Sequence, residues 1–378
     1  MEIRPYIVDI PEDALDDLRT RLKRARFPRP DPLPGPGPTP RELEALLLRW
    51  REAYDWRRVE NELNDLGLFE TVVDSLTIRF LHVRSPMAHA RPLFLSHGWP
   101  GSVIEFLDAI PALIDPVAHG GRSEDAFHLV IPCLPGFGFS EQPRVTGWSV
   151  ERIADAFHAV ILALGYERYF AQGGDWGAMI STALLNRFPE HCRGIHLNMV
   201  VAPPPPEMLL LPTKEESAEI AGRDEFNRLG SAYAMVQATR PMTIGYGLVD
   251  SPGALAAWVL EKFAEWTHGP GFGGIREERL LDNLMLYWLP AAGASAARIY
   301  RESYARPDLG PVTGPAGCTI FPGELFRPSR RWAEGRFKNI VYWNEAERGG
   351  HFAALEAREI FVREIRACFR VFADRGEC

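Results

Sequence analysis

The stretch Tyr169-Phe170-Ala171-Gln172-Gly173-Gly174-Asp175-Trp176-Gly177 decides the fold. Its first four residues read as a strand, and a helical pattern begins at about Trp176. Between them, Asp175 is the centre of a Gly-x-Asp-x-Gly pattern. Small flanking residues are needed on so tight a turn, because neighbouring β-carbons would collide there. A carboxylate at this place projects from a helix N-terminus, whose dipole favours its ionised form. The pattern predicts a nucleophile, and the alternative is that Asp175 only caps the following helix.

Strands alternate with helices on both sides of this turn. The run PLFLSHGWPGS (92–102) is an apolar strand that ends in a glycine and proline loop, and FHLVIPCLPGFGFS (127–140) repeats the design. A helical pattern follows in VERIADAFHAVILALG (150–165). This alternation predicts parallel βαβ units, whose ligands bind beyond the carboxyl ends of the strands. We therefore expect an α/β fold with a mostly parallel, doubly wound sheet and functional residues in the loops after its strands.

Two such loops carry residues that could work together with a nucleophile at Asp175. The loop His97-Gly98-Trp99-Pro100-Gly101-Ser102 is placed to supply a backbone N–H to an oxyanion, and the residue after the nucleophile supplies a second. We expect these donors to be the N–H groups of Trp99 and Trp176. In the other loop, Gly349-Gly350-His351-Phe352, a histidine follows the strand-like IVYW.

An order of nucleophile, acid and histidine requires an acidic residue between Asp175 and His351 at the end of a strand. Glu324, in the segment FPGEL (321–325), occupies that place, and Asp308 and Glu345 are rival acids. Each residue alone also has an ordinary explanation as a turn residue, but the three occur in the required order. Ser140 lacks the strand–turn–helix context of a nucleophile, so we interpret its loop as structural.

A helical region interrupts the alternation. The run PPPP (203–206) ends it, and residues 207–302 read as helices before strand texture returns in CTIFPGELF and FKNIVYWNEAERGGH. We predict a catalytic core at 89–204 and 303–378 with a helical cap inserted at 205–302. Residues 1–88 form an additional N-terminal segment with a proline-rich linker at 28–40. Within that segment we expect a strand at 7–10, a helix at 12–27 and a β-like run at 69–85.

Composition excludes several classes of protein. The 378 residues carry a net charge of -8 without a lysine or arginine block, which argues against a nucleic-acid partner. Five cysteines without ligand spacing predict a reducing compartment, with neither a structural zinc site nor a disulfide framework. No run of about 18 apolar residues occurs, so we expect no membrane span and a cytoplasmic protein.

The motifs GGDWG, HGWPGS, PGFGFS, FPGELF and RGGHF together resemble those of the α/β-hydrolase-fold epoxide hydrolases, specifically the microsomal-type branch. The N-terminal stretches DALDDLRTRL and YDWRRVENELN resemble the extra segment of that branch, so the similarity covers nearly the whole chain. The resemblance is to the soluble bacterial and fungal relatives, so we expect no membrane anchor of the kind found in microsomal members. It also departs from the family at Ser75 and Arg79, where glycine and histidine are favoured, outside the expected chemistry.

The resemblance implies two cap tyrosines that hold the epoxide oxygen. Tyr233 precedes Gln237-Ala238-Thr239-Arg240-Pro241 and matches the first, and Tyr300 in ARIYRES matches the second. Either could be an ordinary buried aromatic residue without that match. Other tyrosines could substitute, mainly in the second role: Tyr246, Tyr287 and Tyr304.

The resemblance implies hydrolysis of an epoxide to a vicinal diol through an ester on Asp175, with His351 and Glu324 activating water and no metal or organic cofactor. The nearest alternative is a haloalkane- or haloacid-type dehalogenase, which also uses an aspartate but has no need of a tyrosine pair. A more distant one is a non-catalytic protein that binds a hydrophobic ligand. The sequence leaves open the substrate, its regio- and enantioselectivity, a detoxifying or biosynthetic role, and a homodimer.

Overall fold

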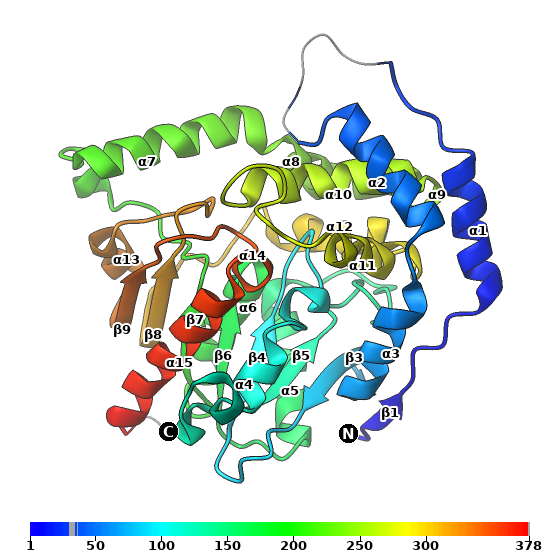
Figure 1. Cartoon of the computed structure of the whole chain (residues 1–378). Helices are drawn as coiled ribbons and strands as arrows, with labels where there is room; N and C mark the ends of the chain where they lie inside the picture. Colours follow the sequence, from blue (N-terminus) through cyan, green and yellow to red (C-terminus); the bar gives the residue numbers. More distant parts are fainter. Residues whose placement is uncertain (30–34, 36, 377–378) are drawn as a thin grey trace.

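The computed structural model describes residues 1–29, 35 and 37–376 (Figure 1). Its strands are β1 Arg4–Tyr6, β2 Leu68–Val73, β3 Leu76–Val83, β4 Arg91–Ser96, β5 Phe127–Pro132, β6 Tyr169–Gly173, β7 Cys192–Leu197, β8 Val312–Ile320 and β9 Phe337–Glu345. Its α-helices are α1 Glu12–Lys23, α2 Pro40–Glu52, α3 Trp56–Leu66, α4 Ile110–Ile114, α5 Val150–Ala163, α6 Asp175–Arg187, α7 Lys214–Glu225, α8 Ala232–Thr239, α9 Pro241–Asp250, α10 Pro252–Trp266, α11 Glu277–Trp288, α12 Gly293–Ser303, α13 Arg330–Arg336, α14 Ala353–Glu356 and α15 Arg358–Asp374.

The strands form one sheet in the order β1-β2-β3-β5-β4-β6-β7-β8-β9. From β5 to β9 the neighbouring strands are parallel, whereas β1, β2 and β3 add an antiparallel edge. Helical crossovers between the central strands explain the parallel part. The predicted α/β fold with a mostly parallel sheet is therefore confirmed.

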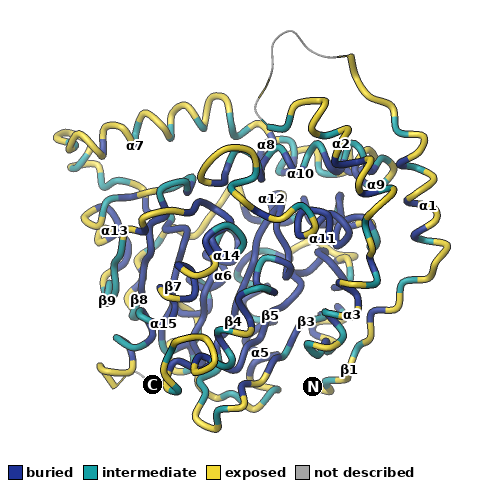
Figure 2. Tube along the Cα trace, in the orientation of Figure 1, coloured by how far each residue is buried: buried dark blue, intermediate teal, exposed yellow. Residues whose placement is uncertain are grey.

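Helices cover both faces of the sheet. Figure 1 shows α4 and α15 in front of the strands and α5 and α6 behind them. The middle of the sheet is buried, as the dark blue strands of Figure 2 show, and every residue of β5 is buried. Continuous apolar strands of this kind are typical of sheets covered on both sides. The loops at the ends of these strands thus stand on a buried part of the sheet.

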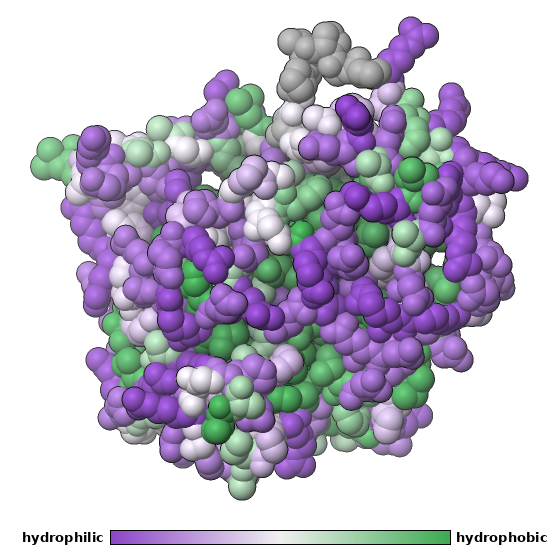
Figure 3. All heavy atoms as spheres, viewed as in Figure 1, coloured by the Kyte–Doolittle hydropathy of each residue, from purple (hydrophilic) through white to green (hydrophobic). Residues whose placement is uncertain are grey.

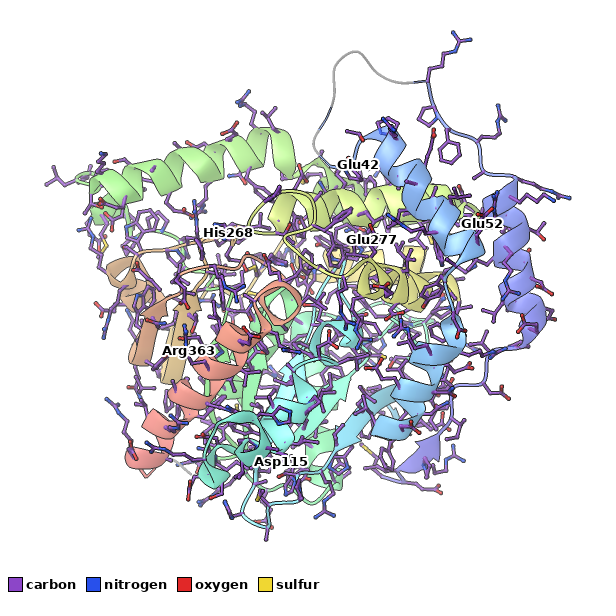
Figure 4. The ribbon with its side chains drawn as sticks, viewed as in Figure 1. Glu42, Glu52, Asp115, His268, Glu277 and Arg363 are labelled. Atoms are coloured by element: carbon purple, nitrogen blue, oxygen red, sulfur yellow. The ribbon has the colours of Figure 1, made fainter. Side chains whose placement is uncertain are left out.

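A second layer of helices lies beyond the carboxyl ends of the strands. Helices α8–α12 are stacked there, and α1 and α2 of the N-terminal segment lie beside them (Figure 1). An ion pair of 2.5 Å joins Arg49 of α2 to Glu277 of α11, which is labelled in Figure 4. The face shown in Figure 3 is mainly hydrophilic, with scattered apolar residues. Among the described helices, none has the length and apolar character needed to cross a membrane.

The N-terminal segment differs from the sequence prediction in three places, one of which is the helix predicted at 12–27, which ends at Lys23. The strand predicted at 7–10 is wrong, because the strand is β1 at Arg4–Tyr6. The backbone N–H groups of Val8 and Ile10 instead donate to the side chains of Asn64 and Glu60 on α3, at 2.9 and 2.8 Å.

The β-like run 69–85 divides into the two antiparallel strands β2 and β3. They are joined at Asp74 and Ser75, whose φ angles of 50° and 63° make a tight turn. Of the predicted proline-rich linker, residues 30–34 and 36 lie outside the described part of the chain.

Candidate active site

Asp175 stands on a sharp turn between β6 and α6. Its φ is 51°, a left-handed conformation that costs a non-glycine residue about 1–3 kcal/mol. A β-carbon on Gly177 would lie 2.0 Å from the carbonyl oxygen of Ser96, and one on Gly173 would lie 2.1 Å from that of Gly177. Neither position has room for a side chain. The small residues that the sequence pattern called for are therefore required by backbone contacts.

The loop after β4 holds one oxygen of Asp175. The backbone N–H of Trp99 donates to Asp175 Oδ1 at 2.8 Å. A β-carbon on Gly98 would lie 2.0 Å from the same oxygen, so only glycine lets the loop approach this closely. Trp176 is the second residue of α6, where a backbone N–H has no acceptor within the helix. The loop thus holds one predicted N–H donor against Asp175, and the other belongs to the residue that follows Asp175 in the chain.

His351 lies between two carboxylates. Its Nδ1 is 2.8 Å from Glu324 Oε1, and its Nε2 is 3.5 Å from Asp175 Oδ2. The loops that carry His351 and Glu324 are aligned by a hydrogen bond of 3.0 Å from Gly323 N–H to the Gly349 carbonyl. All three predicted residues thus meet, each beyond the end of a different strand.

The two rival acids do not take this place. Asp308 is exposed and accepts the backbone N–H of Gly310 at 2.8 Å, and Glu345 is exposed at the end of β9. The Ser140 hydroxyl donates to the Cys133 carbonyl at 2.7 Å and accepts from Arg79 N–H at 2.9 Å. Its backbone contacts give Ser140 a structural role.

The electrostatic setting of His351 favours a proton on its ring. Burial by itself lowers the pKa of His351, but the carboxylates of Glu324 and Asp175 outweigh it and raise this pKa well above its ordinary value. This setting favours an imidazolium between the two carboxylates.

The predicted tyrosines lie in an aromatic cluster over Asp175. The ring of Tyr233 stacks on Trp99 at 5.1 Å, and Tyr300 meets Trp176 edge-on at 4.9 Å. The two tyrosine rings are 5.9 Å apart. Burial and the nearby charge of Asp175 raise the pKa of Tyr233, and burial, Tyr233 and Asp175 raise that of Tyr300. Both phenols are therefore protonated at neutral pH.

The substitute tyrosines are placed differently. Tyr246 is 73% exposed, and Tyr304 is 37% exposed with its ring 5.9 Å from that of Tyr300. Tyr287 is buried, but its hydroxyl donates to the Gly101 carbonyl at 2.8 Å. The hydroxyl of Tyr287 is thus occupied by a hydrogen bond to the loop 97–102, which we call the oxyanion loop.

Sequence reasoning missed the cap residues that hold the site loops. Asn283 of α11 donates to the Pro100 carbonyl at 2.8 Å and accepts from the Ser102 hydroxyl at 2.7 Å. The Trp266 carbonyl accepts the backbone N–H of His351 at 2.9 Å. His268, labelled in Figure 4, follows two residues after Trp266, in the loop after α10. The available signal was the polar pair Asp282-Asn283 inside the otherwise apolar run LLDNLMLYWL.

Comparison with known protein families gives two matches. Residues 3–106 match the model of the epoxide hydrolase N terminus, and residues 91–219 match that of the alpha/beta hydrolase fold. A relative from Stigmatella aurantiaca, whose name places it among the epoxide hydrolases, is 46% identical over 97% of this chain and 85% of its own. Epoxide hydrolase 1 of Oryctolagus cuniculus is 32% identical over 96% of this chain and 88% of its own.

Solved structures agree with these matches. The epoxide hydrolase of Aspergillus niger superposes with a TM-score of 0.88 at 32% identity, over 98% of this chain and 96% of its own. The juvenile hormone epoxide hydrolase of Bombyx mori gives a TM-score of 0.91 at 30% identity, over 99% and 96%. The fold, the motifs and the relatives agree, and the chain belongs to the microsomal-type branch of the epoxide hydrolases, enzymes of the α/β-hydrolase fold.

Proposed function

We propose that this enzyme opens an epoxide to a vicinal diol through a covalent ester on Asp175. The observation that carries the proposal is that the two oxygens of this carboxylate have different partners. Oδ1 accepts the Trp99 N–H at 2.8 Å, whereas Oδ2 faces His351 at 3.5 Å. One oxygen is thus already in the oxyanion site, and the other is the attacking atom.

In the first step, Asp175 Oδ2 attacks a ring carbon of the epoxide and the C–O bond on the opposite face breaks. The oxygen that leaves the ring takes a proton from Tyr233 or Tyr300. Phenols are far more acidic than alcohols, so the transfer is favourable, and they remain protonated until substrate arrives. The product of this step is an alkyl ester of Asp175 that carries a hydroxyl on the neighbouring carbon.

Formation of the ester changes the charge around His351. The neutral ester no longer raises the pKa of His351, so the imidazolium gives its proton to the tyrosinate left by the first step and becomes a base. His351, oriented by Glu324, then takes a proton from water, and the oxygen of that water attacks the ester carbonyl.

The N–H groups of Trp99 and Trp176 stabilise the resulting oxyanion. When the ester bond breaks, one proton of the water ends on the diol and the other on His351, which restores the resting state.

The proposal is tested by mass spectrometry of the intact enzyme after mixing with styrene oxide. His351→Gln should accumulate a species heavier by the mass of one epoxide, because the ester forms but is not hydrolysed. Asp175→Asn should show no such species and no diol. Diol formation by Asp175→Asn at the rate of the unmodified enzyme, or the absence of an adduct in His351→Gln, would contradict the ester mechanism.

A further inference from the structure

A small cavity lies beside Asp175, below the oxyanion loop. It leaves about 10 Å³ for the centre of a water-sized sphere, which is room for roughly one water molecule. Side chains of Glu105, Asp175, Asn198 and His351 line it. A water at this place has the nucleophile and the base as neighbours, so the cavity is suited to the water that hydrolyses the ester.

Glu105 enters this cavity from a short 3-10 helix, Val103–Phe106, that follows the oxyanion loop. A β-carbon on Gly101 would lie 1.5 Å from Glu105 Oε1, just as one on Gly98 would lie 2.0 Å from Asp175 Oδ1. The two glycines of the HGWPG loop therefore each make room for one carboxyl group. Asp175 is the first of these groups and Glu105 is the second.

The charges around Glu105 change with the state of Asp175. Burial raises the pKa of Glu105 to about 8, the charges of Asp175 and Glu324 raise it too, and His351 and the Ser102 N–H oppose them. The charge of Glu105 in turn raises the pKa of Tyr287. When Asp175 becomes a neutral ester and His351 gives up its proton, Glu105 loses one charge that disfavours its ionisation and one that favours it. The role of Glu105 therefore rests on its place in the cavity beside Asp175 and His351.

We propose that Glu105 holds the attacking water, together with His351, against the ester carbonyl of Asp175. The water donates one hydrogen bond to His351, which removes that proton, and the other to the Glu105 carboxylate. A lone pair of the oxygen is thereby aimed at the ester carbon. Glu105 undergoes no covalent change. This role rests on the proposed ester mechanism.

Glu105→Gln tests the role, since glutamine has nearly the same shape but cannot be a carboxylate. Single-turnover mixing with styrene oxide gives the rates of ester formation and ester hydrolysis separately. We expect hydrolysis to fall about 10- to 100-fold and ester formation to change less than about threefold, because only the second step uses the water. Glu105→Asp should recover part of the hydrolysis rate. The ratio of the two rates does not depend on the folded fraction of the sample.

Glu356→Gln is a matched control. Glu356 is a second partly buried carboxyl group near His351, with its pKa raised to about 7 by burial. It accepts the backbone N–H groups of His268 and Phe352, at 2.7 and 3.2 Å, and does not line the cavity. We expect this variant to keep the ratio of the two rates.

Three results would overturn the role of Glu105: hydrolysis by Glu105→Gln at the unmodified rate, equal loss of both rates in Glu105→Gln, or the same altered ratio in Glu356→Gln. If His351→Gln accumulates the ester while Glu105→Gln hydrolyses it normally, only this inference fails. If no ester forms in His351→Gln, the ester mechanism itself fails.

Discussion

Single atoms decide the geometry at Asp175. Gly98 lets the oxyanion loop come within hydrogen-bond distance of the carboxylate, and Gly177 lets α6 start against β4. These contacts involve backbone and reacting atoms that cannot move aside. The glycine pattern in the sequence thus marks the places where backbone segments pass close to Asp175 and to each other.

Gly98→Ala should inactivate the enzyme without unfolding it. The new β-carbon would lie 2.0 Å from Asp175 Oδ1, so the loop must withdraw and the Trp99 N–H bond must break. Loss of one oxyanion donor predicts a fall in kcat/KM of about 100- to 1000-fold. Steady-state hydrolysis of styrene oxide, with circular dichroism as the check on folding, measures this.

Gly222→Ala is the matched control, because no atom lies within 4 Å of a β-carbon at that position in α7. It should leave activity unchanged and stabilise the helix slightly. Full activity of Gly98→Ala would show that the loop is not held as described.

At this scale, sequence reasoning proposes a site residue where that residue carries its own signal. Asp175, Trp99 and His351 lie in glycine-rich motifs whose spacing reflects backbone geometry, and Glu324 follows from chain order. Glu105 and Asn283 have no such signal, because their positions depend on contacts between segments far apart in the chain. The roles of all these residues remain predictions until the variants are measured.

Helix α11 ties three parts of the molecule together. Its buried Arg279 pairs with Glu62 of α3 at 2.7 Å, Asp108 of the core at 2.6 Å and Asp282 of the helix itself at 3.1 Å. One and two turns further along, Asn283 and Tyr287 hold the oxyanion loop. The N-terminal segment therefore supports the site through α11 without contacting the nucleophile.

Arg279→Ala should destabilise the protein by about 3 kcal/mol, because the Arg279 side chain is only 5% exposed and three carboxylates lose it as a partner at once, although Asp282 keeps its ion pair with Arg58. Arg276→Ala is the matched control. Arg276 also pairs with Asp108, at 2.8 Å, but its side chain is 61% exposed, so the expected loss is below about 1 kcal/mol. Urea denaturation followed by tryptophan fluorescence compares the two, and equal losses would refute the importance of the buried network.

Local sequence patterns predicted most elements but not all. The leucines of α1 mark its buried face, as periodicity indicated. The strand at 7–10 was wrong because an apolar, β-branched run can equally well be held by helix side chains, here those of Asn64 and Glu60. Strand propensity does not say which partner a backbone finds.

At the scale of the whole molecule, the sheet extends across the predicted boundary between the N-terminal segment (1–88) and the catalytic core. Strands β1, β2 and β3 belong to the N-terminal segment, yet they continue the catalytic sheet through the pairing of β3 with β5. The fold class followed from strand–helix alternation and the family from the motifs. The antiparallel edge and the contacts of the cap could not follow from local patterns, because they depend on long-range pairing.

The central claim is that the oxygen added to the epoxide first comes from Asp175. The most direct measurement is a single turnover in ¹⁸O-water with enzyme in excess, followed by mass analysis of the diol and of the peptide that contains Asp175. We predict an unlabelled diol and one ¹⁸O in the Asp175 carboxylate. A diol that carries ¹⁸O in this first turnover would show direct attack by water and contradict the account.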